Sequence, residues 1–287
     1  MLGIILLLVA FIGSGLASIH DLKTTEIPDE IPYVMIGIGI VGNLIESYLA
    51  WSYWPFLLSI IVGLSFLGVG FLMYFMGQWG GGDAKLLSGI GFLLPQLPPQ
   101  FKISLFFPFP VSLFFNVFFV GAIYMIVYAL TMSIVNKRVW DVFLKDLRAN
   151  SRAILIINFA LVAFLFISSI ILTRYYHTFL VIDAMAFGIM IILVFSGLFI
   201  LWKFVKTVEN VGFKKRIPIS KLKIGDVPVD YKIWEGITEK ELKKIKGSKK
   251  KYIWIKEGVR FAPAFPLALA FTILLGDGVL WMIGLVG

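Results

Sequence analysis

The stretch Trp54–Met76, WPFLLSIIVGLSFLGVGFLMYFM, carries no charged side chain and is followed closely by Gly80-Gly81-Gly82-Asp83. A membrane-spanning helix needs about 20 predominantly apolar residues, so the first of these segments predicts such a helix. A carboxylate at the edge of a hydrophobic run is costly, and an ionisable group near lipid indicates a functional site. This part of the chain therefore predicts both a membrane fold and a candidate site.

The composition extends the membrane prediction to the whole chain. Of its 287 residues, 59% are hydrophobic and 15% are charged, whereas soluble domains average about 45–50% apolar and 25% charged residues. The absence of cysteine excludes disulfides, zinc–thiolate sites and thiol catalysis. With only two histidines, the sequence also argues against a histidine zinc site or a Ser-His-Asp triad.

We expect an all-α fold, a polytopic transmembrane bundle of about eight helices with a small cytoplasmic segment before the last one. The expected spans are approximately residues 2–19, 33–50, 54–76, 84–97, 110–135, 154–172, 179–204 and 262–285. The first run lacks a basic leader and an A-x-A site, so we interpret it as a retained helix rather than a signal peptide. We expect four parts. They are a core with both candidate carboxylates (1–135), two additional helices (136–202), a basic cytoplasmic segment (203–260) and a C-terminal helix (261–287).

Positive charge predicts the sidedness. With the N-terminus outside, 24 of the 26 Lys and Arg residues fall in cytoplasmic loops, as the positive-inside rule requires. Seventeen of these basic residues lie between Lys203 and Arg260, and this clustering argues against a general nucleic-acid binder. We therefore expect a multi-pass plasma-membrane protein with both termini outside and with Asp21 and Asp83 at the cytoplasmic boundary.

Asp21, at the end of the first hydrophobic run, is the candidate partner of Asp83. Two carboxylates that share a site cannot both ionise easily, so one can hold a proton as an acid while the other activates water. Gly80 and Gly82 lack side chains and would let a substrate backbone approach Asp83. The pattern predicts an acid–base pair that needs no metal and no cofactor.

The basic segment contains two elements of its own. Thr238 to Glu241 has the pattern of a capping box, and Leu242 and Ile245 follow on one face, which predicts a short amphipathic helix. Tyr252 to Ile255 is typical of a short strand. The segment is too short for an independent core, so we expect it to pack against the membrane face.

Several motifs carry a resemblance to a known family. The segment from Asp21 to Pro28, DLKTTEIP, resembles the D-x5-I-P pattern that follows the first helix of type IV prepilin peptidases. Gly80 to Asp83 is similar to the G-x-G-D pattern of the same membrane aspartyl peptidases. In the tail, residues 236–242, 254–258 and 261–265 look like the C-terminal region of archaeal members, among them prearchaellin (preflagellin) and prepilin peptidases.

The resemblance implies an aspartic endopeptidase with Asp21 and Asp83 as its catalytic pair. Its substrates would be pilin-like or archaellin-like precursors, cut at the cytoplasmic face to remove a short basic leader, the class III signal peptide. Glu26, Asp29 and Glu30 would attract that leader by charge complementarity. The partners implied are the precursor and the lipid bilayer, and the oligomeric state is left open.

Two alternatives remain at this point. Presenilin and signal-peptide-peptidase type proteases share G-x-G-D, and the tail Pro263-Ala264-Phe265 resembles their Pro-Ala-Leu. A transporter could use Asp183 and Asp277, which lie within hydrophobic runs, as an ion path. The lack of an evident internal repeat argues against a transporter, and a structural link is the simpler reading of Asp183. A phosphate loop is excluded because the spacing G-x-x-x-x-G-K-[ST] is absent.

Overall fold

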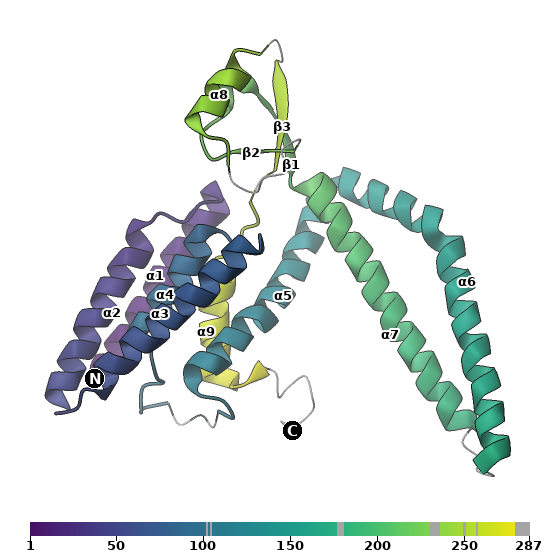
Figure 1. Cartoon of the computed structure of the whole chain (residues 1–287), viewed down its shortest axis with the longest axis horizontal. Helices are drawn as coiled ribbons and strands as arrows, with labels where there is room; N and C mark the ends of the chain where they lie inside the picture. The colour runs from purple at the N-terminus through teal and green to yellow at the C-terminus, as the bar shows by residue number, and fades with distance from the viewer. Residues whose placement is uncertain are drawn as a thin grey trace. The chain divides into compact units, whose positions relative to one another are not determined.

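The computed structural model describes residues 1–101, 103, 105–176, 181–229, 236–248, 251–256 and 258–278. It divides into two compact units, which we call the core unit (Met1–Val127 with Ile217–Gly287) and the hairpin unit (Tyr128–Arg216) (Figure 1). Each is described separately below. The four-part division made from the sequence stays a prediction.

The all-α membrane fold is confirmed, and the number of eight spans stays a prediction. Among the described residues, four helices are long and apolar enough to cross a membrane, or up to five if a bent pair counts as one span. The four are α1 (Leu2–Thr24), α2 (Glu30–Leu49), α3 (Trp54–Phe75) and α5 (Phe109–Val135). Two of the expected spans form shorter helices, α4 (Gly81–Leu93) and α9 (Ala264–Leu275). Their 13 and 12 residues extend about 20 Å at about 1.5 Å per residue, less than the roughly 30 Å of a bilayer core.

The short helix α4 lies at the centre of the core unit, where it packs against α1, α2 and α3 (Figure 1). Its side chains from Asp83 to Leu93 are all buried except the partly exposed Lys85. Close approach of α3 requires Gly70, because a Cβ atom there would lie 2.7 Å from the Cα atom of Ala84. The apolar character of α4 on every side thus follows from its enclosure.

The C-terminal end of α4 is closed by polar side chains of its neighbours. The helix ends at Leu93, two residues before Pro95, which disfavours a helical conformation in the residue preceding it. The Phe92 carbonyl accepts hydrogen bonds from Asn43 Nδ2 at 2.9 Å and Ser59 Oγ at 2.6 Å. Backbone groups at membrane depth must be satisfied within the protein, and these two side chains allow a helix to stop there.

The C-terminal end of α9 is closed in the same manner from α5. Asn116 Nδ2 donates to Thr272 Oγ1 and to the Gly276 carbonyl, both at 2.8 Å. Its Oδ1 accepts the Gly278 N–H at 2.9 Å. Gly276 adopts φ 82°, a left-handed conformation that favours glycine. Asn116 therefore fixes the turn that follows α9.

A small α/β element precedes α9. It contains β1 (Lys214–Pro218), η2 (Ile219–Lys221), β2 (Val227–Pro228), α8 (Glu239–Lys246) and β3 (Tyr252–Lys256). The strand order is β1-β3-β2, with β2 and β3 antiparallel, and Leu242 and Ile245 of α8 pack on a cluster around Ile255. The predicted capping box is confirmed: the Glu241 carboxylate accepts the Thr238 N–H at 2.8 Å, and this bond lowers the pKa of Glu241. The predicted short helix and strand are both present.

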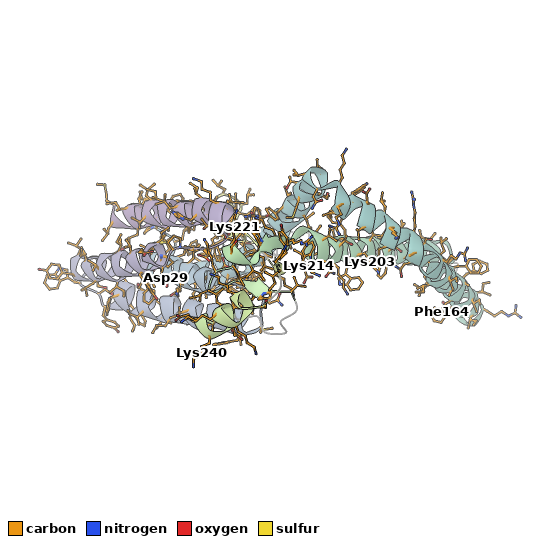
Figure 2. All side chains as sticks on the ribbon, turned by 90° about the horizontal axis from the view of Figure 1, so that it is seen from above. Asp29, Phe164, Lys203, Lys214, Lys221 and Lys240 are labelled. Atoms are coloured by element: carbon orange, nitrogen blue, oxygen red, sulfur yellow. The ribbon has the colours of Figure 1, made fainter. Side chains whose placement is uncertain are left out.

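The hairpin unit consists mainly of α6 (Lys137–Tyr176) and α7 (Val181–Thr207), followed by a π-helical turn at Val208–Gly212. The spans expected from the sequence leave residues 136–153 between two helices, but the structure makes this stretch the first part of α6, which bends by 45° before Leu155. Its charges are accommodated by pairing, since Lys203 of α7 binds Asp146 at 2.9 Å. Asn158 and Ser196 also bond to one another across the two helices. Figure 2 shows Phe164 on α6 and Lys203 on α7.

Candidate active site

Asp21 lies on the buried face of α1. The buried residues of this helix recur every three or four positions, through Ala10, Ser14, Ala17, Ser18 and Asp21, so all share one side of the helix. The Asp21 side chain is 4% exposed, whereas the adjacent His20 is exposed. Helical periodicity therefore carries Asp21 into the interior of the core unit and turns His20 away from it.

The segment that leads into α9 holds the Asp21 carboxylate. Asp21 Oδ2 accepts the buried backbone N–H of Ala262 at 2.9 Å. The Arg260 carbonyl in turn accepts the Tyr124 hydroxyl of α5 at 2.9 Å. Residues far apart in the sequence thus meet at Asp21.

Asp83 lies in the first turn of α4, at the same end of the core unit as Asp21. Its Oδ2 accepts the Gly80 N–H at 3.0 Å, which satisfies a backbone donor ahead of the helix, and a carboxylate is favoured at this position by the helix dipole. The Asp83 side chain is 7% exposed, and its buried Oδ1 has no hydrogen-bond partner among the described residues.

The two carboxylates that the sequence paired lie close to one another. The loop that follows Asp21 contacts the glycine run before Asp83, since a Cβ atom on Gly82 would lie 2.9 Å from the Ile27 Cβ. Three consecutive antiparallel spans, α1 to α3, return the chain to the end of the bundle where α1 stops, and α4 begins there. Each carboxylate accepts one backbone N–H, Asp21 from Ala262 and Asp83 from Gly80, and the second oxygen of Asp83 has no partner among the described residues.

Gly82 links the two motifs directly. A Cβ atom on Gly82 would lie 2.9 Å from the Ile27 Cβ, so the space beside this glycine is filled by Ile27 of the D-x5-I-P segment. Beside Gly80, a Cβ atom would lie 3.2 Å from Asp83 Oδ2. The expectation that these glycines leave room for a substrate backbone stays a prediction. Gly82 in addition serves the packing of the loop against α4.

The acidic residues of the first loop differ in their surroundings. Asp29 binds Lys85 of α4 at 2.7 Å, and this ion pair joins the loop to the start of the short helix. Glu26 and Glu30 are exposed. The proposed attraction of a basic leader therefore rests more on Glu26 and Glu30 than on Asp29.

An aromatic cluster next to the carboxylates was not predicted from the sequence. Trp79, 8% exposed, precedes the glycine run and stacks on Phe118 of α5, with ring centroids 5.5 Å apart. It also contacts Phe261 and Phe265 at 5.8 and 5.7 Å between ring centroids. The sequence feature that could have indicated this cluster is Trp79, a tryptophan between a hydrophobic run and three glycines. This cluster anchors the glycine run against the segment that holds Asp21.

Asp277 and Asp183, the carboxylates that a transporter could use, are a separate question from the pair Asp21 and Asp83. Asp277 Oδ2 accepts the Phe106 N–H at 2.6 Å, which ties the turn after α9 to the segment before α5. The Asp183 side chain lies outside the described ones. Within the described part of the chain, no group of three or more His, Cys, Asp or Glu side chains could hold a metal ion.

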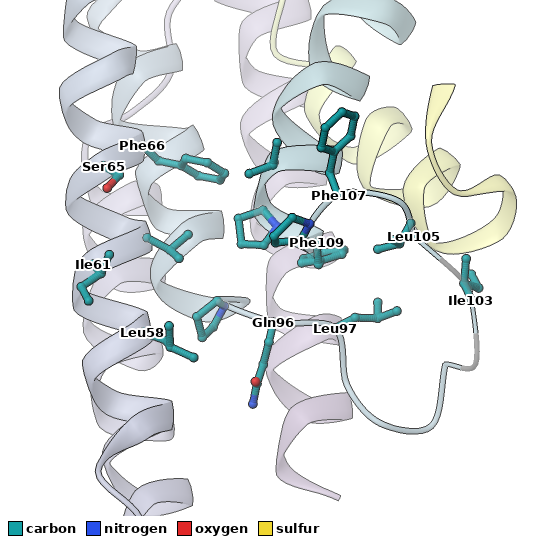
Figure 3. A pocket seen from close by; sticks show the side chains of 15 residues that line it. Leu58, Ile61, Ser65, Phe66, Gln96, Leu97, Ile103, Leu105, Phe107 and Phe109 are labelled. Carbon is teal, nitrogen blue, oxygen red and sulfur yellow. The ribbon is translucent and has the colours of Figure 1, made fainter. Parts of the chain in front are cut away.

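An apolar pocket of about 670 Å³ lies at the other end of α4 (Figure 3). Its lining comes from α3 between Leu58 and Phe66, from the segment between α4 and α5, including Leu97, and from the start of α5 at Phe109. Asp83 and the end of α4 at Leu93 are ten residues apart, about 15 Å along the helix, so the pocket is not part of the carboxylate site.

Comparison with known proteins finds a family model that matches part of the chain. Residues 6–129, which include Asp21, the glycine run and Asp83, match the model of the type IV leader peptidase family. This segment is thus similar to the type IV leader peptidase family. The resemblance seen in the first loop and the glycine run is thereby confirmed, whereas the tail at 236–265 lies outside the matched segment.

Individual proteins similar to this chain are archaeal. A preflagellin peptidase of Methanococcus voltae is 33% identical over 130 residues, 42% of this chain and 52% of that protein. The prepilin peptidase EppA of Methanothermobacter thermautotrophicus is 25% identical over 150 residues, 49% of this chain and 39% of that protein. A preflagellin peptidase of Methanocaldococcus jannaschii is 36% identical over 89 residues. The chain thus spans about half or less of the length of the curated relatives it matches.

Proposed function

We propose that this chain is an aspartic endopeptidase of membranes that removes the short basic leader from archaellin-like or type IV pilin-like precursors. The observation that carries the proposal is the buried carboxylate pair, Asp21 on α1 and Asp83 on α4, at one end of the core unit. The archaeal relatives are named preflagellin and prepilin peptidases, and these names support the substrate class.

In the proposed reaction one carboxylate removes a proton from water while the water oxygen attacks the scissile carbonyl carbon. The other carboxyl group donates a proton to the nitrogen as the carbon–nitrogen bond breaks. A proton then passes from the first carboxyl group to the second and restores the starting state. This division of roles is what two neighbouring carboxylates in a buried site can supply.

The substrate is proposed to approach from the cytoplasmic side. Positive charge supports this sidedness, because 24 of the 26 Lys and Arg residues then face the cytoplasm. Glu26 and Glu30, both exposed at this end of the core unit, would meet the basic leader. The apolar segment of the precursor would lie beside the helices of the core unit, with the cleavage point at the level of the carboxylates.

The test uses membranes that contain the full chain and purified precursors of both kinds, one archaellin-like and one pilin-like. The expected result is a shortened product whose new N-terminus, mapped by mass spectrometry, lies between the basic leader and the apolar segment. A cut within the apolar segment would instead support an intramembrane protease of the presenilin type. No cleavage of either precursor by well-inserted protein would overturn the proposal.

A further inference from the structure

One face of α4 is turned towards the first loop and α2. Gly82, Lys85 and Gly89 share this face, because residues three, four and seven positions apart lie on the same side of a helix. Ile27 fills the space beside Gly82, and a Cβ atom on Gly89 would lie 3.1 Å from a side chain of α2. Between these two close approaches, Lys85 Nζ binds Asp29 Oδ1 at 2.7 Å. An ion pair therefore joins the first turns of α4 to the loop.

The loop that carries Asp29 is also tied to the end of α1. The Thr25 N–H donates to the Asp21 carbonyl at 2.8 Å, and Thr25 adopts φ 61°, a left-handed conformation that turns the chain out of the helix. Asp29 follows four residues later and is the residue that precedes α2. A short path of contacts thus leads from the backbone of Asp21 through the loop to Lys85 of α4.

Lys85 is directed away from the carboxylate site. It follows Asp83 by two positions, which places the two side chains about 200° apart around the helix axis. Its amino group binds the Asp29 carboxylate and lies 5.5 Å from the centroid of the Tyr33 ring, on the first turn of α2. A cation above an aromatic ring is favoured, so the ring and the carboxylate together hold Lys85 against the start of α2.

We propose that the ion pair of Lys85 and Asp29 positions α4 against the first loop and thereby holds Asp83 in place relative to Asp21. The two members of the ion pair are positioning residues and take no part in the proton transfers. The inference rests on the proposed peptidase function for its chemistry. The ion pair is partly exposed, with 22% and 55% of the two side chains accessible, and such pairs contribute little to global stability. Its loss should therefore change the geometry of the site more than the unfolding temperature.

The expected result of removing the ion pair is a loss of kcat at constant KM. Displacement of a catalytic group by about 1 Å can lower a rate about 100-fold, so for Lys85→Met and for Asp29→Asn we expect kcat to fall about tenfold. Because either substitution removes the same ion pair, the double variant should lose no more than each single variant. Lys85→Arg keeps a cation that can bind a carboxylate and stack on Tyr33, and it should retain most of the activity.

The experiment measures kcat and KM for precursor cleavage by the full chain in membranes, for the wild type and these four variants. Lys240→Met, which removes an exposed cation from α8 of the same unit (Figure 2), is the matched control and should leave both constants unchanged. Each variant is assayed with a leader of full basic charge and with a leader whose Lys residues are replaced by Gln. If Asp29→Asn raises KM for the basic leader alone, Asp29 binds the leader instead, and the positioning role is overturned.

A second measurement needs no activity. Hydrogen–deuterium exchange followed by mass spectrometry should show faster exchange in Lys85→Met than in the wild type at residues 25–31 and 80–86. Lys85→Arg and Lys240→Met should exchange as the wild type does. Unchanged exchange at both segments, an unchanged kcat, or equal losses of kcat in Lys85→Arg and Lys85→Met would overturn the proposal. If the wild type cleaves no precursor while the exchange difference is present, the proposed function fails and the positioning of α4 by the ion pair stands.

Discussion

Gly82 of α4 and Ile27 of the first loop are in contact, since a Cβ atom on Gly82 would lie 2.9 Å from the Ile27 Cβ. The two motifs of the family resemblance therefore touch, one through its second glycine position and the other through the isoleucine of D-x5-I-P. Gly81 lies between Gly80 and Gly82 in the sequence. A Cβ atom on Gly81 would have the Tyr74 ring as its nearest neighbour, at 3.9 Å, and would therefore be accommodated without displacement.

Gly82→Ala should reduce both stability and cleavage. The added methyl group must displace Ile27 or α4, and overpacking of this kind costs about 1–3 kcal/mol. Because Asp83 is the next residue, its carboxylate should move away from Asp21, and kcat should fall at least tenfold. Gly81→Ala is the matched control and should differ little from the wild type in thermal unfolding and cleavage assays. Equal behaviour of the two variants would contradict the packing role of Gly82.

Asp21→Asn and Asp83→Asn should each abolish cleavage of a leader-containing precursor. An amide can neither accept a proton from water nor donate one as a carboxylic acid, so neither half of the proposed reaction survives. Asp277→Asn is the matched control, because Asp277 is as buried as the pair but binds only the Phe106 N–H. Membrane insertion and cleavage are measured in the same samples; full activity in either pair variant would end the dyad model.

The sequence predicted the pair of carboxylates but not what surrounds it. Hydrophobic runs and charge placed Asp21 and Asp83 at one end of three spans, and the structure brings them together. Ala262 and Arg260 could not be placed from the sequence, because nothing local to either motif reports a contact made by a segment near the other end of the chain.

Two of the expected spans form shorter helices for a physical reason. The runs that became α4 and α9 are apolar enough to suggest crossings, but each stops early because side chains of other helices satisfy the ends. Asn43 and Ser59 close α4, and Asn116 closes α9. Hydropathy alone cannot reveal that a buried polar residue on one helix terminates another.

Gly70→Ala on α3 should disturb the start of α4. A Cβ atom there would lie 2.7 Å from the backbone Cα of Ala84, which cannot rotate away, so α4 has to shift and carry Asp83 with it. We expect a loss of about 1–3 kcal/mol of stability and a reduction in kcat. Gly68→Ala on the same helix has nothing within 4 Å and should behave as the wild type in both measurements. A stable, fully active Gly70→Ala protein would show that α4 tolerates displacement.

Asn116→Leu should destabilise the core unit without acting on the carboxylates directly. The substitution leaves the buried Gly276 carbonyl and Gly278 N–H without their side-chain partner, and each unsatisfied group costs about 1–3 kcal/mol. Thr272→Val removes only one of the bonds of Asn116 and should cost less. Denaturant unfolding in detergent gives the comparison. The reverse order of stabilities would contradict the closing role assigned to Asn116.

Glu26→Gln combined with Glu30→Gln should raise KM for a precursor with a basic leader and leave kcat nearly unchanged. The two exposed carboxylates act by charge complementarity, so the difference from the wild type should shrink at high salt, where such attraction is screened. Glu46→Gln, near the opposite end of α2, removes the same charge far from the carboxylate pair and serves as the control. Cleavage rates are compared for leaders with their full basic charge and for leaders with Lys replaced by Gln. If the double variant handles both leaders as the wild type does, the first loop does not recruit the substrate, and recognition has to reside in the helices that flank Asp21 and Asp83.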